Sequence, residues 1–226
     1  MPDSAEDKRR LAELASFAAG LKWPDIPADT KAAARAATLY GLAVGTASAE
    51  APLMPQVDKA VEALEPGAAP QATRFMDGER IGVQGAALSN GALVHVRMQE
   101  DAHPAGHVGV AVIPAAIAAA EQAGASGADL LCAVTAGFEV SLRIGRDHAA
   151  SLSGRGFRTT PIYGAMGAAV AAARAHGMDG DATARAISLS ANMGSGLREF
   201  QEAGTFEYAL HAGCGARDGL VAAALA

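Results

Sequence analysis

The feature that most constrains the fold is the repeated use of small apolar residues in segments of helical character. Apolar residues make up 50% of the 226 residues, whereas aromatic residues make up only 4%. Alanine favours helices, and small side chains let neighbouring helices approach closely. The sequence therefore predicts an all-α fold in a single domain over residues 1–226, with residues 1–5 expected to be disordered.

Capping residues and helix breakers divide the chain into segments. Helices are predicted over residues 4–19, 27–45, 55–64, 84–97, 110–123, 126–145, 161–177 and 208–226, with one more that Asp181 caps. Residues 151–158 are predicted to form a loop. An Asp77-Gly78 pair between two short apolar runs indicates one small β-hairpin within residues 73–83.

Charge and composition exclude several partners. The formal net charge is -6 without a cluster of Lys and Arg, so no nucleic acid partner is expected. The charged N-terminus is unlike a signal peptide, and the uncharged stretch 102–120 contains His and Pro, so no membrane partner is expected. Cys132 and Cys214 fit reduced core thiols, which favours a cytoplasmic protein. The apolar end, residues 219–226, is expected to be covered by more chain or by a partner.

Polar and titratable residues gather between two apolar helical segments, at residues 90–114. This stretch holds His95, His103 and His107, three of the six histidines, together with Glu100 and Asp101. The spacing of His103 and His107 suits two metal ligands on a helix, but Pro104 and Gly106 disfavour a helix there, so no metal is predicted. The histidines alternatively cap helix ends. The sharper hypothesis is acid–base chemistry by an imidazole that a carboxylate orients.

Two other segments carry candidate site residues. Arg155, Arg158 and Thr159 precede a predicted helix, where guanidinium and backbone N–H groups suit a carboxylate or phosphate, although a solvated basic loop has the same composition. Tyr208 and His211 are three residues apart on the last predicted helix and can share one face. They fit either a site or a structural contact between helices.

Taken together, these motifs resemble the MmgE/PrpD family, which includes 2-methylcitrate dehydratase and cis-aconitate decarboxylase. The matches cover residues 11–226 in the order of the family: Asn90-Gly91, His95, Glu100-Asp101, His103, His107, Val112-Ile113-Pro114, Gly137-Phe138-Glu139, Arg155-Gly156-Phe157, Gly164-Ala165-Met166-Gly167, Ser195-Gly196-Leu197 and Leu210-His211-Ala212-Gly213.

The resemblance implies a large helical domain, normally followed by a smaller α/β domain, with the active site in the cleft between them. It also implies a homodimer formed through the helical domain, and small carboxylate substrates handled without a cofactor. This chain resembles only the helical part and lacks the second α/β domain. A second subunit that supplies this domain is therefore a possible partner.

The chain departs from the family pattern at four positions. Met98 stands where the family has Asp, Ala102 where it has Thr, Arg158 where it has His, and Tyr208 where it has Lys. Because Arg158 restores a cation and Tyr208 can still carry a proton, these exchanges favour changed chemistry over lost chemistry.

The resulting hypothesis is a cofactor-independent lyase, either a dehydratase or a decarboxylase, that abstracts a proton next to a carboxylate or carbonyl. His107 is expected to transfer the proton, with Asp101 and His103 to orient it and Tyr208 as second proton carrier. Arg158 is expected to bind the substrate, and the other expected substrate-binding residues are Arg155, Thr159 and His211. The alternatives are an isomerase, epimerase or cyclase with the same site, and a non-catalytic subunit.

Overall fold

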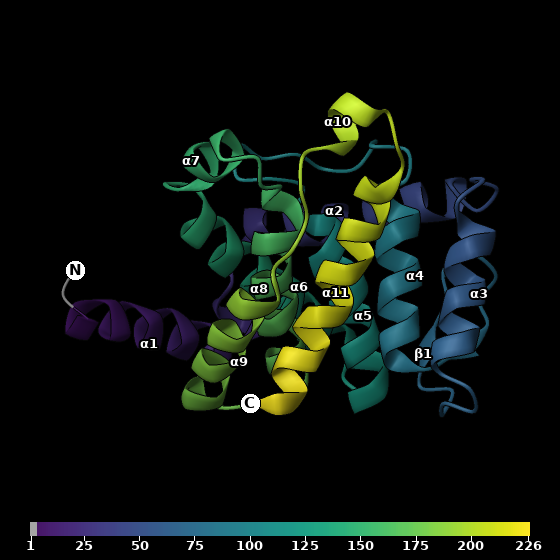
Figure 1. Cartoon of the computed structure of the whole chain (residues 1–226). Helices are drawn as coiled ribbons and strands as arrows, with labels where there is room; N and C mark the ends of the chain where they lie inside the picture. The colour runs from purple at the N-terminus through teal and green to yellow at the C-terminus, as the bar shows by residue number, and fades with distance from the viewer. Residues whose placement is uncertain (1–3) are drawn as a thin grey trace.

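The computed structural model describes residues 4–226, which form a helical bundle with one small sheet at its side (Figure 1). The helices are α1 (Ser4–Gly20), α2 (Ala28–Ala47), α3 (Met54–Leu64), α4 (Val83–His95), α5 (Gly109–Ala123), α6 (Gly127–Gly145), α7 (Ala149–Gly154), α8 (Thr159–Ala175), α9 (Gly180–Met193), α10 (Phe200–Ala203) and α11 (Glu207–Leu225). A 3₁₀ turn, Trp23–Asp25, joins α1 to α2.

The predicted helical fold with a single β-hairpin is confirmed. Strands β1 (Ala72–Thr73) and β2 (Arg80–Ile81) pair antiparallel, and Ala72 lies opposite Ile81. Gly78 in the connecting turn has a φ of +77°, a conformation that costs a glycine little. The sheet lies beside α4 and α5, and Ala72 of β1 is fully buried in the main core cluster.

The centre of the molecule is formed by α4, α5, α8 and α11, whose facing residues are mostly Ala, Gly and Val. Glycines set the distance between these helices. A Cβ atom on Gly91 of α4 would lie 2.8 Å from the Cα atom of Gly213 in α11, and one on Gly219 would lie 2.4 Å from the Ala168 Cβ of α8. The tight helix contacts expected from composition are therefore present.

Several boundaries differ from the prediction. Residues 149–154 form the short helix α7 where a loop was expected, and α10 was not predicted. The cap of α9 is Asp179, whose side chain accepts from the Ala182 N–H at 2.8 Å, and not Asp181. Ser4 and Ala5, which fall within the stretch 1–5 expected to be disordered, begin α1, which has acidic residues in its first turn. The rest of that expectation, residues 1–3, lies outside the described residues.

The apolar end of the chain is largely covered by the chain itself. Leu220, Ala222 and Ala223 are buried in the main core cluster, where α11 packs against α8 and α9. Ala224 and Leu225 are exposed, Leu225 to 65%. Among the described residues, no helix combines the length and the hydrophobicity that crossing a bilayer requires.

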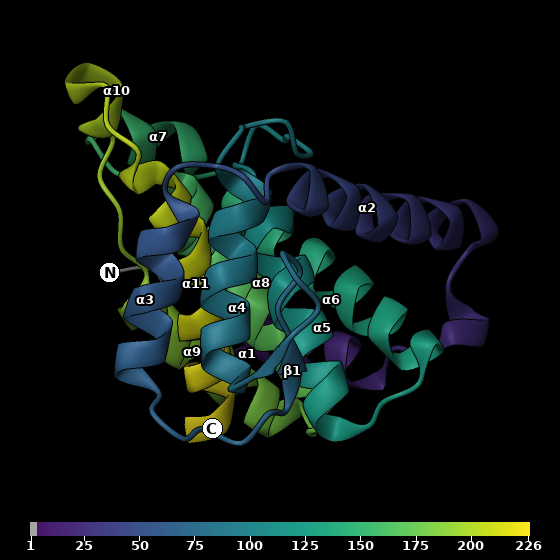
Figure 2. The same ribbon diagram turned by 90° about the vertical axis from the view of Figure 1, so that its right-hand side faces the viewer.

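Helix direction places several helix ends together. α4 ends where α5, α8 and α11 begin, at the upper end of the molecule in Figure 1, and α7 and α10 lie at the same end. Helix α2 lies near this end and extends outward from one side of the bundle (Figure 2). Because N–H groups at helix starts carry partial positive charge, this end of the bundle favours anions.

Candidate active site

A polar cleft of about 260 Å³ opens at this end of the bundle. Its lining comes from four segments: the connection between α4 and α5, Ser153 of α7, the start of α8, and the segment around α10. The lining includes His103, His107, Arg158, Thr159, Arg198 and Phe200. The cleft therefore brings together four of the eight predicted site residues.

Backbone pairing brings the segment before α10 to the cleft. The Arg158 N–H donates to the Gly196 carbonyl, and the Arg198 N–H donates to the Gly156 carbonyl, both at 3.0 Å. Phe157 and Leu197 thereby form an isolated β-bridge. These bonds place Arg198 and Phe200 over the start of α8.

Glu100 is the carboxylate at the centre of the site. Its side chain is 1% exposed, and one oxygen, Oε1, lies 2.7 Å from His95 Nδ1 and 2.9 Å from His107 Nδ1. Burial acts to raise the pKa of Glu100, but the hydrogen bonds from His107 and His95 outweigh it and lower the pKa to about 2. Glu100 is therefore ionised at neutral pH.

His95 lies at the last position of α4, fully buried, between Glu100 and Arg158. Its Nδ1 faces Glu100, and its Nε2 faces the Arg158 guanidinium. A guanidinium can only donate, so Nε2 must accept and the proton must lie on Nδ1. Burial also lowers the pKa of His95, which is consistent with a neutral ring.

The imidazole of His107 lines the cleft and has a shifted pKa. The hydrogen bond to Glu100 raises the pKa of His107, and the backbone carbonyl of Asp101 acts in the same direction. The His107 backbone N–H donates to Thr160 Oγ1 at 3.1 Å, which ties the loop to the start of α8. His107 is half-buried and lines the cleft, so it can meet a ligand there.

Arg158 is a buried cation, 6% exposed, at the N-cap position of α8. One guanidinium nitrogen donates to the Tyr208 carbonyl at 3.0 Å, and the group stacks 4.6 Å from the centre of the Phe200 ring. Burial lowers the pKa of Arg158 to about 10, so the group stays charged at neutral pH. The groups that contact the Arg158 guanidinium, including the neutral His95 ring, carry no charge. The positive charge of Arg158 is therefore available to an anion in the cleft.

The predicted orienting role of Asp101 falls geometrically to its neighbour Glu100. Asp101 instead lies against the start of α5, where a Cβ on Gly109 would come within 2.2 Å of its Oδ1 atom. Burial raises the pKa of Asp101, and a hydrogen bond from the Gly109 backbone opposes this. Its side chain thus lies at the start of α5, and within residues 4–226 His107 forms its ion pair with Glu100 and none with Asp101.

His103 and Tyr208 also differ from their predicted arrangement. His103 is exposed at the rim of the cleft, and its Nδ1 accepts from the Ala105 N–H at 3.0 Å. The Tyr208 hydroxyl donates to the Val96 carbonyl at 2.8 Å, and its ring meets His95 edge to face at 5.6 Å. Burial raises the pKa of Tyr208. This tyrosine packs behind the cleft and is poorly placed to act as a base.

The remaining predicted residues divide between the cleft and its surroundings. Thr159 is the first residue of α8 and lines the cleft. Arg155 is exposed after α7 and does not line it. His211 lies one turn into α11, with its ring 6.3 Å from that of Phe200 and a buried Nδ1 that has no partner among the described residues.

Sequence reasoning left His95, Glu100, Arg198 and Phe200 out of the site. His95 and Glu100 lay within the polar stretch that pointed to the site, so their residue types were the available signal. Arg198 and Phe200 carried no such signal, because only the pairing of residues 156–158 with 196–198 brings them to the cleft. Within residues 4–226, no group of three His, Cys, Asp or Glu side chains is arranged to hold a metal ion.

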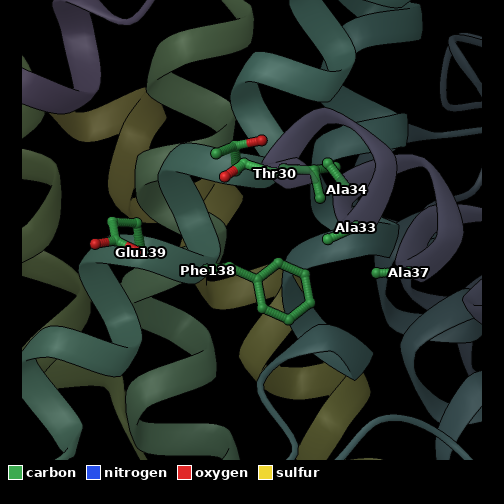
Figure 3. Close-up of a pocket in the computed structure, with 8 residues that line it drawn as sticks. Thr30, Ala33, Ala34, Ala37, Phe138 and Glu139 are labelled. Atoms are coloured by element: carbon green, nitrogen blue, oxygen red, sulfur yellow. The ribbon is translucent and has the colours of Figure 1, made fainter. Parts of the chain in front are cut away.

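A second hollow, of about 200 Å³, lies between α2 and α6 (Figure 3). The Phe138 ring of α6 and the methyl groups of Ala33, Ala34 and Ala37 of α2 line it. Its lining is mostly apolar and contains none of the predicted site residues. The polar cleft is therefore the better candidate for an active site.

Comparisons with known proteins point to one family. A family model described as the MmgE/PrpD N-terminal domain matches residues 12–226. The chain is 32% identical to the cis-aconitate decarboxylase-like protein oryM of Aspergillus oryzae over 234 aligned positions, which cover 99% of this chain and 48% of the relative. It is 30% identical to a cis-aconitate decarboxylase of Aspergillus terreus, with 99% and 47% covered. The chain thus spans about half the length of these relatives.

Proposed function

This chain belongs to the MmgE/PrpD family, and from that premise we propose that its helical domain carries the acid–base half of a lyase site for a small carboxylate. The reaction is a decarboxylation or a dehydration, and it uses no cofactor. The observation that carries the proposal is the continuous cluster of Arg158, His95, Glu100 and His107 at the polar cleft. The similarity to cis-aconitate decarboxylases supports a lyase and does not fix the substrate of this chain.

In the proposed mechanism, Arg158 binds a substrate carboxylate. The guanidinium is buried and its protein contacts are uncharged, so a carboxylate in the cleft gains a strong charge-assisted hydrogen bond. The Thr159 hydroxyl and the backbone N–H groups at the start of α8 add hydrogen-bond donors that also favour an anion. Arg198 at the cleft offers a second cation for a second carboxylate.

His107 carries the proton. Because its pKa is raised, a larger share of the ring is protonated at neutral pH than for a free histidine, so it enters the reaction as an acid. In a decarboxylation, the bond to the departing carboxylate breaks, its electron pair stays on carbon, and His107 protonates that carbon as carbon dioxide leaves. In a dehydration, a neutral His107 takes the proton from the carbon next to the carboxylate, and the electron pair of that C–H bond forms the new C=C bond as the C–O bond breaks. The same proton then goes to the departing hydroxyl group, which leaves as water.

When His107 is neutral, its ring can take a proton from the substrate. Glu100 then stabilises the protonated ring. When a proton is taken from one carbon position and returned to another without loss of carbon dioxide or water, the reaction is an isomerisation, which stays the second candidate. A non-catalytic subunit is the third, and the fixed Tyr208 hydroxyl is the observation in its favour. Homodimer formation and a cytoplasmic location remain parts of the proposal.

The test is turnover of small carboxylates, beginning with cis-aconitate, in D₂O with detection by proton NMR. The wild-type protein is expected to release carbon dioxide or water, or to exchange a carbon-bound proton for deuterium. His107→Gln is expected to lower the rate by about 100-fold or more, the range for a lost proton carrier. Arg155→Gln, on an exposed residue outside the cleft, is the control and should keep the wild-type rate.

Equal rates for wild type and His107→Gln would rule out the proton-carrier role. If no carboxylate reacts or exchanges with the wild-type protein, the lyase and isomerase candidates both fall and the non-catalytic candidate is favoured.

A further inference from the structure

We infer that His95 is a positioning residue that couples the anion-binding Arg158 to the proton-carrying pair of Glu100 and His107. The inference deepens the proposed function and rests on it for the roles of Arg158 and His107. His95 itself does not line the cleft, so it acts through its two neighbours and not on the substrate.

The packing fixes the His95 ring on every side. The ring is 0% exposed at the end of α4, its centre is 5.5 Å from that of His107, and the Tyr208 ring meets it edge to face at 5.6 Å. The Tyr208 hydroxyl is held by the Val96 carbonyl, which keeps the tyrosine ring in place. A ring that cannot turn can present each nitrogen to one partner only.

Each ring nitrogen has a distinct task. Nδ1 lies 2.7 Å from Glu100 Oε1, the same oxygen that His107 approaches, so the Nδ1–H group holds the carboxylate against His107. Nε2 accepts from Arg158 and is the only side-chain acceptor of that guanidinium among the described residues. Without His95, the buried Arg158 would keep one carbonyl partner and two aromatic rings.

The charged and titratable groups around His95 are Glu100 and His107 from the connecting loop, Arg158 from α8, and Tyr208 and His211 from α11. Glu100 favours a proton on the ring, whereas Arg158, His107 and burial oppose a charged ring. A neutral ring with the proton on Nδ1 satisfies all of these partners. The coupling therefore requires one tautomer over the whole neutral pH range.

That tautomer is measurable in the unmodified protein. Nitrogen-15 NMR of the histidine-labelled chain at neutral pH should show His95 with a protonated Nδ1 and an unprotonated Nε2, assigned by the signal that His95→Gln removes. A proton on Nε2, or a doubly protonated ring, would overturn the inference. This measurement needs neither turnover nor a ligand.

Two isosteric variants separate the two tasks. In His95→Asn the side-chain amide nitrogen can replace Nδ1 toward Glu100 but leaves Arg158 without its acceptor. In His95→Gln the amide oxygen can replace Nε2 toward Arg158 but leaves Glu100 without its donor. The readouts are the pKa of His107 by NMR titration and the affinity for succinate by calorimetry.

His95→Asn is expected to keep the wild-type pKa of His107 and to weaken succinate binding about tenfold, the effect of one lost hydrogen bond to a charged group. His95→Gln is expected to keep the succinate affinity and to shift the pKa of His107 by about one unit. Equal changes in both readouts for both variants, or no change in either, would overturn the inference.

Failure of the proposed function has a different signature. If wild-type protein does not bind succinate or turn over any carboxylate, the proposed function fails, while the His95 tautomer and the His107 titration still decide the positioning role. Should either variant fail to fold, the His95 ring signals are assigned in the wild-type protein by through-bond NMR correlations to its backbone, and the tautomer measurement decides alone.

Discussion

At the scale of single residues, the Glu100 carboxylate determines the geometry of the cleft. It is buried and ionised, and one of its oxygens meets two histidines. A buried carboxylate of this kind is stable only while its partners remain.

Glu100→Gln is expected to lower the free energy of unfolding by about 3 kcal/mol, in the range for a broken buried ion pair. The pKa of Glu100 is lowered from 4.5 to about 2, so its stabilisation is present above pH 4.5 and is lost as the pH falls toward 2. The pKa of His107 is raised above 6.5, so its stabilisation is present below pH 6.5 and is lost as the pH rises through the raised value.

The difference between wild type and Glu100→Gln should therefore be largest between pH 4.5 and 6.5, the range in which both contributions are present. Urea unfolding of the two proteins across the acid and neutral range measures it. A difference that does not vary with pH would show that Glu100 is not coupled to His107.

The turn before Glu100 stores backbone strain at Met98, whose φ is +52°. Residues other than glycine rarely adopt this conformation, and asparagine tolerates it better than methionine. Met98→Asn is expected to raise the free energy of unfolding by up to about 1 kcal/mol. Gln99→Asn, one residue further along the same exposed turn, is the control and should change it little; equal effects at both positions would argue against strain at Met98.

At the scale of helices, glycine contacts set the positions of the helix ends that form the cleft. A Cβ atom on Gly213 would lie 2.3 Å from the Leu88 carbonyl oxygen, so α11 cannot keep its distance from α4 with a larger residue there. The same two helices carry Tyr208 and His95, and a shift between them would separate the two rings.

Gly213→Ala is therefore expected to lower the free energy of unfolding by about 1–3 kcal/mol, as overpacking of a core does. Gly127→Ala is the matched control, because nothing lies within 4 Å of a Cβ atom at that helical position. The control should be neutral or should stabilise by up to about 1 kcal/mol, the helix preference of alanine over glycine. Thermal or urea unfolding measures both, and equal destabilisation by the two variants would contradict this account of the packing.

The helices themselves were largely predictable because their boundaries are marked locally. Ser126 caps α6 by accepting from the Asp129 N–H at 3.2 Å, and Gly124 ends α5 in a left-handed conformation. Helices α7 and α10, with six and four residues, are too short to show a period of 3.6 and were not predicted. Asp179 and Asp181 are equally good caps by residue type, so only the structure distinguishes them.

At the scale of the whole molecule, the site joins residues that are far apart in the sequence. Arg158 and His95 are 63 residues apart, and Tyr208 and Val96 are 112 apart. Motif resemblance placed His107 and Arg158 at one cleft, but the choice of Glu100 over Asp101 depends on the direction of the chain after Met98. Residue spacing carries no information on that direction, which explains why this part was not predicted.

The central claim is that Arg158 binds a carboxylate beside His107. A crystal structure of the 226-residue protein with bound succinate tests it most directly. The predicted result is a carboxylate on the Arg158 guanidinium, with the adjacent carbon within reach of a His107 ring nitrogen. Succinate bound only elsewhere, for example in the hollow between α2 and α6, with Arg158 left without an anion, would contradict the claim.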